Sequence, residues 1–520
     1  KPSHQTPHLD SLAKDGIQLR AHYAPAPVCA PSRASLFLGQ HQGNSPIRNN
    51  QFDKALPDQP TLGSVLQDAG YSTALIGKWG RQGKGDSAQT WPAYPTKRGF
   101  DYFLGGVRHR DGHEHYPADS VHFKNKRTEV WENESEISES LAGCYTTDLW
   151  TAGAKRWIMQ HRKQSPDKPF FLFLSYDTPH AATQLATSAY PEGGGVKGGL
   201  QWLGKSGEMI NTASDKVDSF IHPDYRDKDW NNVYKRYASS VRRIDNCVGD
   251  LIQTLNDLNI EKDTLVIFSS DHGPSIESYL KERYQANFFE SFGPFSGVKR
   301  DILEGGLRPG AIAKWPGTIP AGKISETPSQ MNDWMPTFCD AAGAPTPALS
   351  DGVSIIPTLT GKGKQQPKTV YTEYAVGGKT PDYKEFPKRL RGRKRGEMQA
   401  IRIGDFKALR YNIDSADAPF EVYNVVKDPR ESKDLAGKSG IPTQQEWLDA
   451  VTRMHGFEAS TKRPFDDLAV AGISASNSKP GLLKRSSAEK TARATLLDSS
   501  IKPLIATHIV HDASTGNIQF

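Results

Sequence analysis

Short apolar runs alternate with amphipathic segments along the first two thirds of the chain. The apolar runs have the length of strands and lie at 71–77, 169–176, 263–273 and 311–317. Helical periodicity is found at 6–15, 61–70, 148–163 and 234–259. Apolar runs without polar alternation are typical of strands buried on both faces. The order therefore predicts an α/β fold, with a large, mostly parallel mixed sheet flanked by helices.

Two of these helices carry recognisable end signals. Thr6 and Thr61 each stand just before an apolar-periodic segment, where a hydroxyl can accept a hydrogen bond from a free backbone N–H. Gly70 follows the second segment and is a suitable stop. We therefore expect Thr6 and Thr61 to be N-caps.

The pattern changes after about residue 365. Alternating, half-buried runs and one later helical segment predict a smaller C-terminal α+β domain over 366–457, an antiparallel sheet plus a helix. Residues 1–365 would then form the large α/β domain. Residues 458–520 have the composition of a linker or a partial extra module, with one late apolar run at 503–510.

Composition narrows the class of protein. Forty-six glycines and 35 prolines indicate long loops on the scaffold. A net charge of +6 with mixed signs is too mild to indicate nucleic-acid binding. No apolar stretch approaches the roughly 20 residues of a membrane span. Four widely spaced cysteines without a C-x-x-C pair disfavour a zinc cluster and a disulfide scaffold.

Polar side chains with catalytic potential follow two of the predicted strands. Asp271 and His272 come directly after one apolar run, and the tetrapeptide ending at His180 comes directly after another. Ligands bind at the carboxyl ends of the strands in open α/β sheets. A metal or catalytic role and simple capping of the following turn both remain open for these residues.

The stretch 28–40, VCAPSRASLFLGQ, raises a separate question about Cys29. Pro31 suits the first turn of a helix and Gly39 can end it. Cys29 would then sit just before a helix N-terminus, with Arg33 one turn on, where oxyanions bind well. Cys29 could be a buried structural residue, half of a disulfide, a metal ligand or a reaction centre, and the polar surroundings at 31–33 are more than a core cysteine needs.

At these residues the chain resembles the formylglycine-dependent sulfatases of the alkaline-phosphatase superfamily. Residues 29–39 match the signature C-x-P-S-R-x-x-L-x-x-G, and 70–79 match the second signature. Further matches follow in the family's order at 99–105, 169–181, 269–273, 297–310, 351–361 and 420–436. The resemblance implies an alkaline-phosphatase-like fold and cleavage of sulfate from a sulfated carbohydrate or an aryl sulfate.

The resemblance also implies roles for single residues. A maturation enzyme would convert Cys29 to formylglycine, the nucleophile, which Arg33 would orient. Calcium would be bound by Asp271, His272 and the converted residue 29. The remaining matches are Lys78 and Lys299 for the sulfate and His180 as general acid toward the leaving oxygen.

Two departures from the family pattern lead to further expectations. Gly80 stands where many sulfatases have histidine, as in a subgroup with G-K-W-G, and we predict that His113 supplies the missing imidazole. The alternative is that 109–117 is simply a polar loop. The apolar strand ending in Asp-Asp that normally opens a sulfatase is not found before residue 29. We therefore expect a truncated sheet that lacks a strand near its centre, weak calcium binding and poor activity.

Other readings stay open at this point. The absent Asp-Asp pair is compatible with a non-catalytic sulfoglycan-binding relative, and sulfate resembles phosphate closely enough for a phosphodiester or phosphonate hydrolase. The basic run 388–395 suits either polyanion binding or a solvated loop. We expect an exported protein whose substrate pocket is built from the loops 81–117, 182–233 and 274–296.

Overall fold

The computed structural model describes residues 2–51, 54–119, 127–204, 209–454 and 502–510. Its helices are α1 (Pro7–Asp15), α2 (Cys29–Leu38), α3 (Leu62–Asp68), α4 (Thr146–Gln164), α5 (Pro223–Arg226), α6 (Asn232–Asp257), α7 (Glu304–Leu307), α8 (Trp334–Ala342), α9 (Ile356–Thr360) and α10 (Gln444–Met454). None of the helices in these ranges is both long and apolar enough to cross a membrane.

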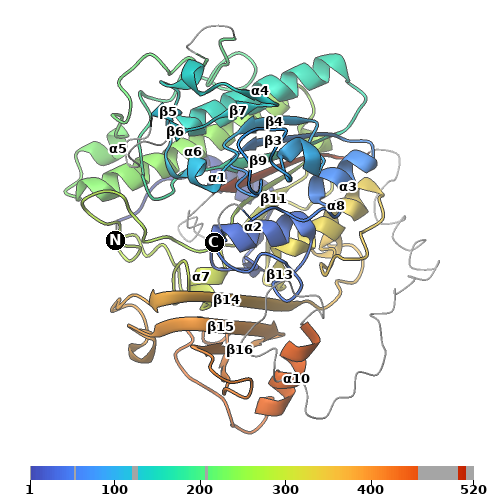
Figure 1. Ribbon diagram of the computed structural model, residues 1–520, viewed down its shortest axis with the longest axis vertical. Coiled ribbons are helices and arrows are strands. Elements are labelled where there is room, and N and C mark those ends of the chain that lie inside the picture. The colour runs from blue at the N-terminus through green and yellow to red at the C-terminus, as the bar shows by residue number, and fades with distance from the viewer. Residues whose placement is uncertain (1, 52–53, 120–126, 205–208, 455–501, 511–520) are drawn as a thin grey trace.

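A ten-stranded mixed sheet runs through the larger part of the described chain (Figure 1). Its order is β12 (Lys323–Ser325), β1 (Ile17–Leu19), β11 (Ala311–Lys314), β10 (Thr264–Ser270), β18 (Leu504–Val510), β9 (Phe170–Tyr176), β3 (Ser72–Gly77), β4 (Tyr102–Gly105), β7 (Trp131–Glu132) and β8 (Ser135–Glu136). The neighbours from β10 to β4 are all parallel, whereas β11 and β7 run antiparallel to them. The expected α/β class, with a mostly parallel mixed sheet, is confirmed.

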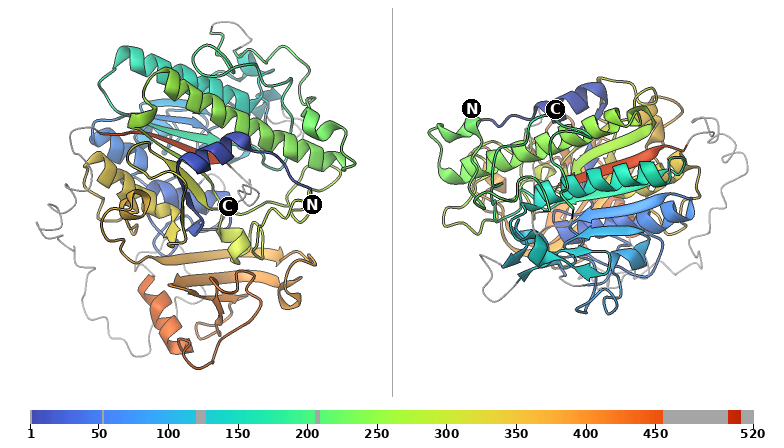
Figure 2. Two further views of the ribbon diagram at one scale, coloured as in Figure 1. Left: turned by 180° about the vertical axis from the view of Figure 1, so that it is seen from behind. Right: turned by 90° about the horizontal axis from the view of Figure 1, so that it is seen from above.

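Helices cover both faces of this sheet, as Figure 2 shows. One apolar core joins the sheet to α2, α3, α8 and α9, and the other joins it to α1, α4 and α6. Every residue of β9 and of β10 is buried. Burial on both faces explains why these strands read as continuous apolar runs.

The centre of the sheet differs from the expectation. The late apolar run forms β18, which lies between β9 and β10 and is parallel to both (Figure 2). The sheet therefore has a strand where we expected a missing one. Residues 504–510 belong to the large sheet rather than to a linker, because Leu504, Ile505 and Ile509 are buried in its two cores. The remaining residues of 458–520 lie outside the described residues, apart from 502–503.

The two predicted N-caps have different outcomes. Thr61 accepts a hydrogen bond from Ser64 N, as expected. Thr6 caps no backbone N–H, so that prediction is wrong. The carboxylate of Asp245 accepts hydrogen bonds from His8 N and Leu9 N instead, at 3.3 and 2.8 Å. A side chain of α6 therefore satisfies the free N-terminal amides of α1.

A second sheet follows along the chain. It is antiparallel, in the order β14 (Thr369–Lys379), β15 (Lys394–Ile403), β16 (Phe406–Tyr411) and β17 (Glu421–Asn424), and α10 packs on it. Short two-stranded sheets pair β2 (His22–Tyr23) with β13 (Ser329–Gln330) and β5 (Ala118–Asp119) with β6 (Arg127–Thr128). In Figure 1, β14 is the strand nearest the large domain, and Tyr374 packs in one apolar cluster with Val28 and Cys29. The C-terminal sheet therefore reaches the Cys29 region.

Candidate active site

Cys29 is the first residue of α2, with Val28 in the N-cap position. All ten residues of the helix are buried. Gly39 ends α2 in the left-handed region at φ 67°, and a Cβ there would meet Met335 at 2.7 Å. The positive end of a helix dipole therefore points at Cys29, in a fixed and water-poor position.

Asp271 and His272 meet Cys29 at the carboxyl end of β10. The ligating atoms of these three residues all lie within 4.8 Å of one another. Ser32 of α2 donates a hydrogen bond to the Asp271 carbonyl oxygen at 2.6 Å, which ties the helix to the strand end. The structure therefore brings these three residues together at one strand end.

The surroundings of Cys29 favour its ionised form. Burial raises the pKa of the thiol, but a hydrogen bond with His272 and the charges of Lys78 and Lys299 outweigh it. The net result is a pKa below the ordinary value for cysteine. A site that stabilises negative charge on residue 29 is suited to an anionic nucleophile and to an anionic substrate.

Arg33 and the two lysines supply positive charge around residue 29. Arg33 is fully buried, and its Nη1 donates to the carbonyl oxygens of Lys78, at 3.3 Å, and Trp79. Its Nε and Nη2 are buried without a hydrogen-bond partner among the described residues. Such a guanidinium is well placed to bind an oxyanion. The ammonium groups of Lys78 and Lys299 are also buried.

A series of contacts connects three histidines to Cys29. Nε2 of His109 lies 3.9 Å from Sγ of Cys29. The ring of His113 lies 5.0 Å from that of His109 and 4.3 Å from that of His180, between centroids. His109 is therefore a second imidazole in contact with Cys29, beside His272, and it is not among the residues predicted from the sequence. The role predicted for His113 stays a prediction.

Three further groups at the site were also missed. The Cys29 thiol lies 3.8 Å from Asn50 Oδ1. Glu277 contacts Lys299 Nζ at 2.9 Å, and the Tyr279 hydroxyl lies 2.6 Å from His113 Nδ1. All three come from loops, where no periodic pattern indicates which side chain turns inward. Tyr279 and Glu277 do lie in 274–296, one of the loops expected to build the pocket.

The donor set fits calcium only in part. Asp271 provides a carboxylate, and Asn50 provides an amide oxygen near residue 29. Calcium takes six to eight oxygen ligands and prefers several carboxylates. The described residues therefore do not make a calcium site by themselves, and no chemical step is assigned to the ion.

The basic run 388–395 is largely engaged with the protein itself. Arg393 forms an ion pair with Glu421 at 2.6 Å, and Arg395 forms one with Asp301 at 2.8 Å. Arg389 lies over the ring of Tyr423 and also bonds to backbone carbonyls. These contacts do not favour polyanion binding by the run.

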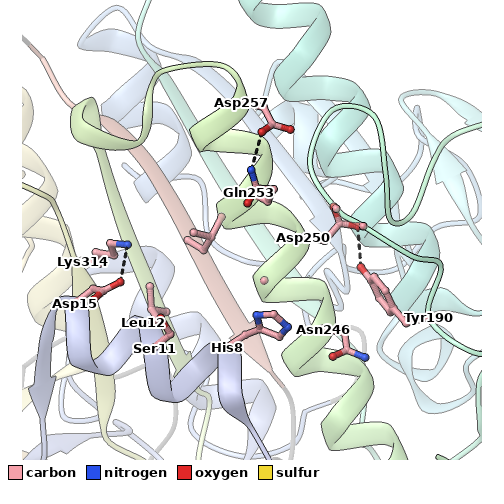
Figure 3. A pocket seen from close by; sticks show the side chains of 14 residues that line it. His8, Ser11, Leu12, Asp15, Tyr190, Asn246, Asp250, Gln253, Asp257 and Lys314 are labelled. Atoms are coloured by element: carbon pink, nitrogen blue, oxygen red, sulfur yellow. Dashed lines mark hydrogen bonds and ion pairs between the residues drawn. The ribbon is translucent and has the colours of Figure 1, made fainter.

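A separate cleft of about 630 Å³ lies between α1 and α6 (Figure 3). Its polar side chains bond to one another, as in the Lys314–Asp15, Tyr190–Asp250 and Gln253–Asp257 pairs. No residue proposed for the chemistry lines it. The Cys29 cluster is therefore the better candidate for the active site.

Two family models and several curated proteins match this chain. The Sulfatase family model matches residues 1–344, and the model described as N-sulphoglucosamine sulphohydrolase, C-terminal, matches 293–454. N-acetylgalactosamine-6-sulfatase of Mus musculus is 29% identical over 71% of this chain and 64% of its own length. Arylsulfatase A of Homo sapiens is 26% identical over 84% of this chain and 79% of its own.

Solved structures share the fold. The crystal structure of Ps i-CgsB has a TM-score of 0.67 at 22% identity and covers 90% of this chain and 91% of that one. The chain spans less than two thirds of the length of the N-acetylgalactosamine-6-sulfatases that it matches. Because the family model matches well over half of its residues, the chain belongs to the sulfatase family.

Proposed function

We propose that this protein is a sulfuric ester hydrolase that removes sulfate from a sulfated carbohydrate or an aryl sulfate. The observation that carries the proposal is the cluster at the N-terminus of α2. There, a buried residue 29 lies among groups that favour negative charge, including Arg33, Lys78 and Lys299. A sulfate ester brings such a charge to the site and develops more on its leaving oxygen.

Residue 29 acts as formylglycine, produced from the cysteine by a maturation enzyme. In its hydrated form it carries two hydroxyl groups on one carbon. One loses its proton and attacks sulfur, and the bond from sulfur to the alcohol oxygen breaks. The second hydroxyl then loses its proton and becomes the aldehyde oxygen, which expels sulfate. Water restores the hydrate.

The neighbouring side chains divide the remaining work. Lys78, Lys299 and the open N–H groups of Arg33 hold the sulfate oxygens. His180 gives a proton to the leaving alcohol oxygen. His109 holds the attacking hydroxyl by a hydrogen bond, because its Nε2 lies 3.9 Å from Sγ of residue 29 and its ring is not one of the predicted metal ligands.

The test begins with the state of residue 29. The chain is produced with a formylglycine-generating enzyme, and the peptide that contains residue 29 is weighed by mass spectrometry. Turnover of 4-nitrophenyl sulfate and of the phosphodiester bis(4-nitrophenyl) phosphate is measured for the wild type, Cys29→Ala and a control, Cys144→Ala, in another apolar core. We expect the aldehyde and sulfate hydrolysis that only Cys29→Ala abolishes. An unmodified thiol without turnover would instead favour a sulfoglycan-binding protein, and a phosphate preference would favour a phosphodiesterase.

A further inference from the structure

Arg300 has an unusual backbone next to the candidate active site. Its φ is 76°, in the left-handed region that few residues other than glycine adopt. Its N–H donates to the carbonyl oxygen of Pro27 at 2.8 Å, two residues before Cys29. Strained residues of this kind persist where the surroundings fix them, and they gather at ligand sites.

The side chain of Arg300 is fixed as firmly as its backbone. Nε donates to Glu277 Oε1 at 2.8 Å, and Nη2 bonds to the same oxygen. Nη1 donates to the hydroxyl of Tyr374 at 3.1 Å. Tyr374 belongs to β14, the strand of the small sheet nearest the large domain (Figure 1). The guanidinium is therefore pre-organised between a loop and the second sheet.

Arg300 is more exposed to solvent than Lys299, the lysine proposed to hold the sulfate. The Lys299 side chain is 2% exposed, whereas that of Arg300 is 29% exposed. Glu277 contacts both of them, so one carboxylate serves two cations. A guanidinium that keeps part of its surface in water at the rim of a site can bind a further anion through its planar N–H groups.

Arg300 adds positive charge beside the proposed sulfate site. Arg33, Lys78, Lys299 and Arg300 are four cations, and the carboxylates among the residues placed at this site are Asp271 and Glu277. One sulfate monoester and the ionised residue 29 balance the difference. A second acid group is therefore favoured by direct contact with the partly exposed guanidinium of Arg300, not by a surplus of charge.

We propose that Arg300 is a specificity-determining residue that binds a second acid group of the substrate, a carboxylate or another sulfate. This inference rests on the proposed function, because the first sulfate must lie at residue 29. Glu277 and Tyr374 hold the guanidinium in place, so little side-chain freedom is lost when the second acid group binds.

The experiment uses two substitutions and one matched control. Arg300→Gln removes the charge at the same backbone strain, and Arg300→Gly removes the side chain and the strain together. Asn259→Gly is the control, because Asn259 is exposed and also has a positive φ, of 56°, at the end of α6. All proteins, including the one with Arg300 unchanged, are produced as the full chain with Cys29→Ala, so that the sulfated sugars bind without being hydrolysed, and their melting temperatures are compared.

Binding is measured by isothermal titration calorimetry with two pairs of sugars. One pair is N-acetylgalactosamine 6-sulfate and its 4,6-disulfate. The other is N-acetylgalactosamine 6-sulfate with a linked uronic acid and the same disaccharide with the carboxylate methylated. We expect the protein with Arg300 unchanged to bind the diacid more tightly than the monoacid in at least one pair. The pair that shows this preference tells whether the second acid group is a sulfate or a carboxylate. The preference should fall about tenfold or more in both Arg300 variants and stay in Asn259→Gly.

Two results would overturn the inference. One is equal or unmeasurable binding of both members of each pair by the protein with Arg300 unchanged. The other is a diacid preference that survives in Arg300→Gln and Arg300→Gly. If Arg300 only joined the two sheets, Arg300→Gly would lower the melting temperature without changing the preference. Failure of the proposed function is seen separately, as no turnover of 4-nitrophenyl sulfate by matured protein.

Discussion

His109 reaches residue 29 because the backbone next to it leaves room. Gly80 has φ 64°, and a Cβ on it would lie 3.2 Å from His109 Cα and 3.1 Å from Arg33 Nη2. The turn that carries His109 is held by Asp111, which pairs with Arg108 at 3.2 Å. Burial, reinforced by Lys78, lowers the pKa of His109 well below its ordinary value, so the ring is neutral at pH 7.

We expect His109→Ala to lower kcat for 4-nitrophenyl sulfate about 100-fold or more, because a group that contacts the nucleophile is lost. Gly80→Ala should also lower kcat, since the new methyl group crowds His109 and Arg33. Gly70→Ala is the matched control: Gly70 has φ 90°, but nothing lies within 4 Å of its added Cβ. Equal kcat values for the two glycine variants would show that strain rather than crowding is responsible.

Among the elements, β18 is the one whose position has the largest consequences for stability. Ile505 is fully buried between the neighbouring strands, whereas Ile403 of β15 is 42% exposed. We expect Ile505→Ala to cost about 2–5 kcal/mol of unfolding free energy and Ile403→Ala less than about 0.5 kcal/mol. Urea denaturation followed by circular dichroism measures both. Equal losses would contradict the central position of 504–510.

His508 makes the same strand sensitive to pH. Burial lowers the pKa of His508 to about 4 from the usual 6.5. Between these values the unfolded chain binds a proton that the folded chain does not, so stability falls as the pH drops through this window. From pH 7.5 to 5 the loss is about 2 kcal/mol. His508→Leu should remove that part of the pH dependence in urea titrations, and Thr507→Val should leave it unchanged.

Sequence patterns predict some of these elements but not the position of every strand. Local periodicity predicts the strands β9 and β10 and the helices α4 and α6. Their consecutive residues carry the apolar pattern that burial on one or both faces requires. Local periodicity does not predict the place of β18, since its partners are more than two hundred residues away. The prediction of the α1 N-cap was wrong for the same reason, because the capping residue Asp245 lies far away along the chain.

Some residues of the candidate site could be predicted from the sequence and others could not. Cys29, Asp271 and His272 were predictable because each stands at the end of a regular element, inside a recognisable motif. The choice between His109 and His113 depends on how a loop turns. That turn is set by the Arg108–Asp111 pair and by the contact of Lys78 with Gly112 O, which spacing along the sequence does not encode.

At the scale of the whole molecule, the two sheets are joined by a buried charge cluster. Lys407 of β16 forms ion pairs with Glu304 of α7 at 3.0 Å and with Glu431 at 2.9 Å. All three side chains are buried. Burial raises the pKa of Glu431 above its ordinary value even with Lys407 beside it, whereas Lys407 and Arg308 hold the pKa of Glu304 low against the effect of burial. Lys407 therefore pairs with two carboxylates that are buried between the domains.

We expect Lys407→Met to cost about 3 kcal/mol or more of unfolding free energy at pH 8, because it leaves the buried Glu431 without its cation and leaves Glu304 with Arg308 alone. The loss should be smaller at pH 5. Without Lys407 the folded-state pKa of Glu431 rises further above its unfolded value, so the cost grows as the pH rises. Lys394→Met, at an exposed position of the same sheet, is the control and should change little. Urea titrations at both pH values decide the matter, since equal losses for the two variants at pH 8 would mean that the cluster does not hold the sheets together.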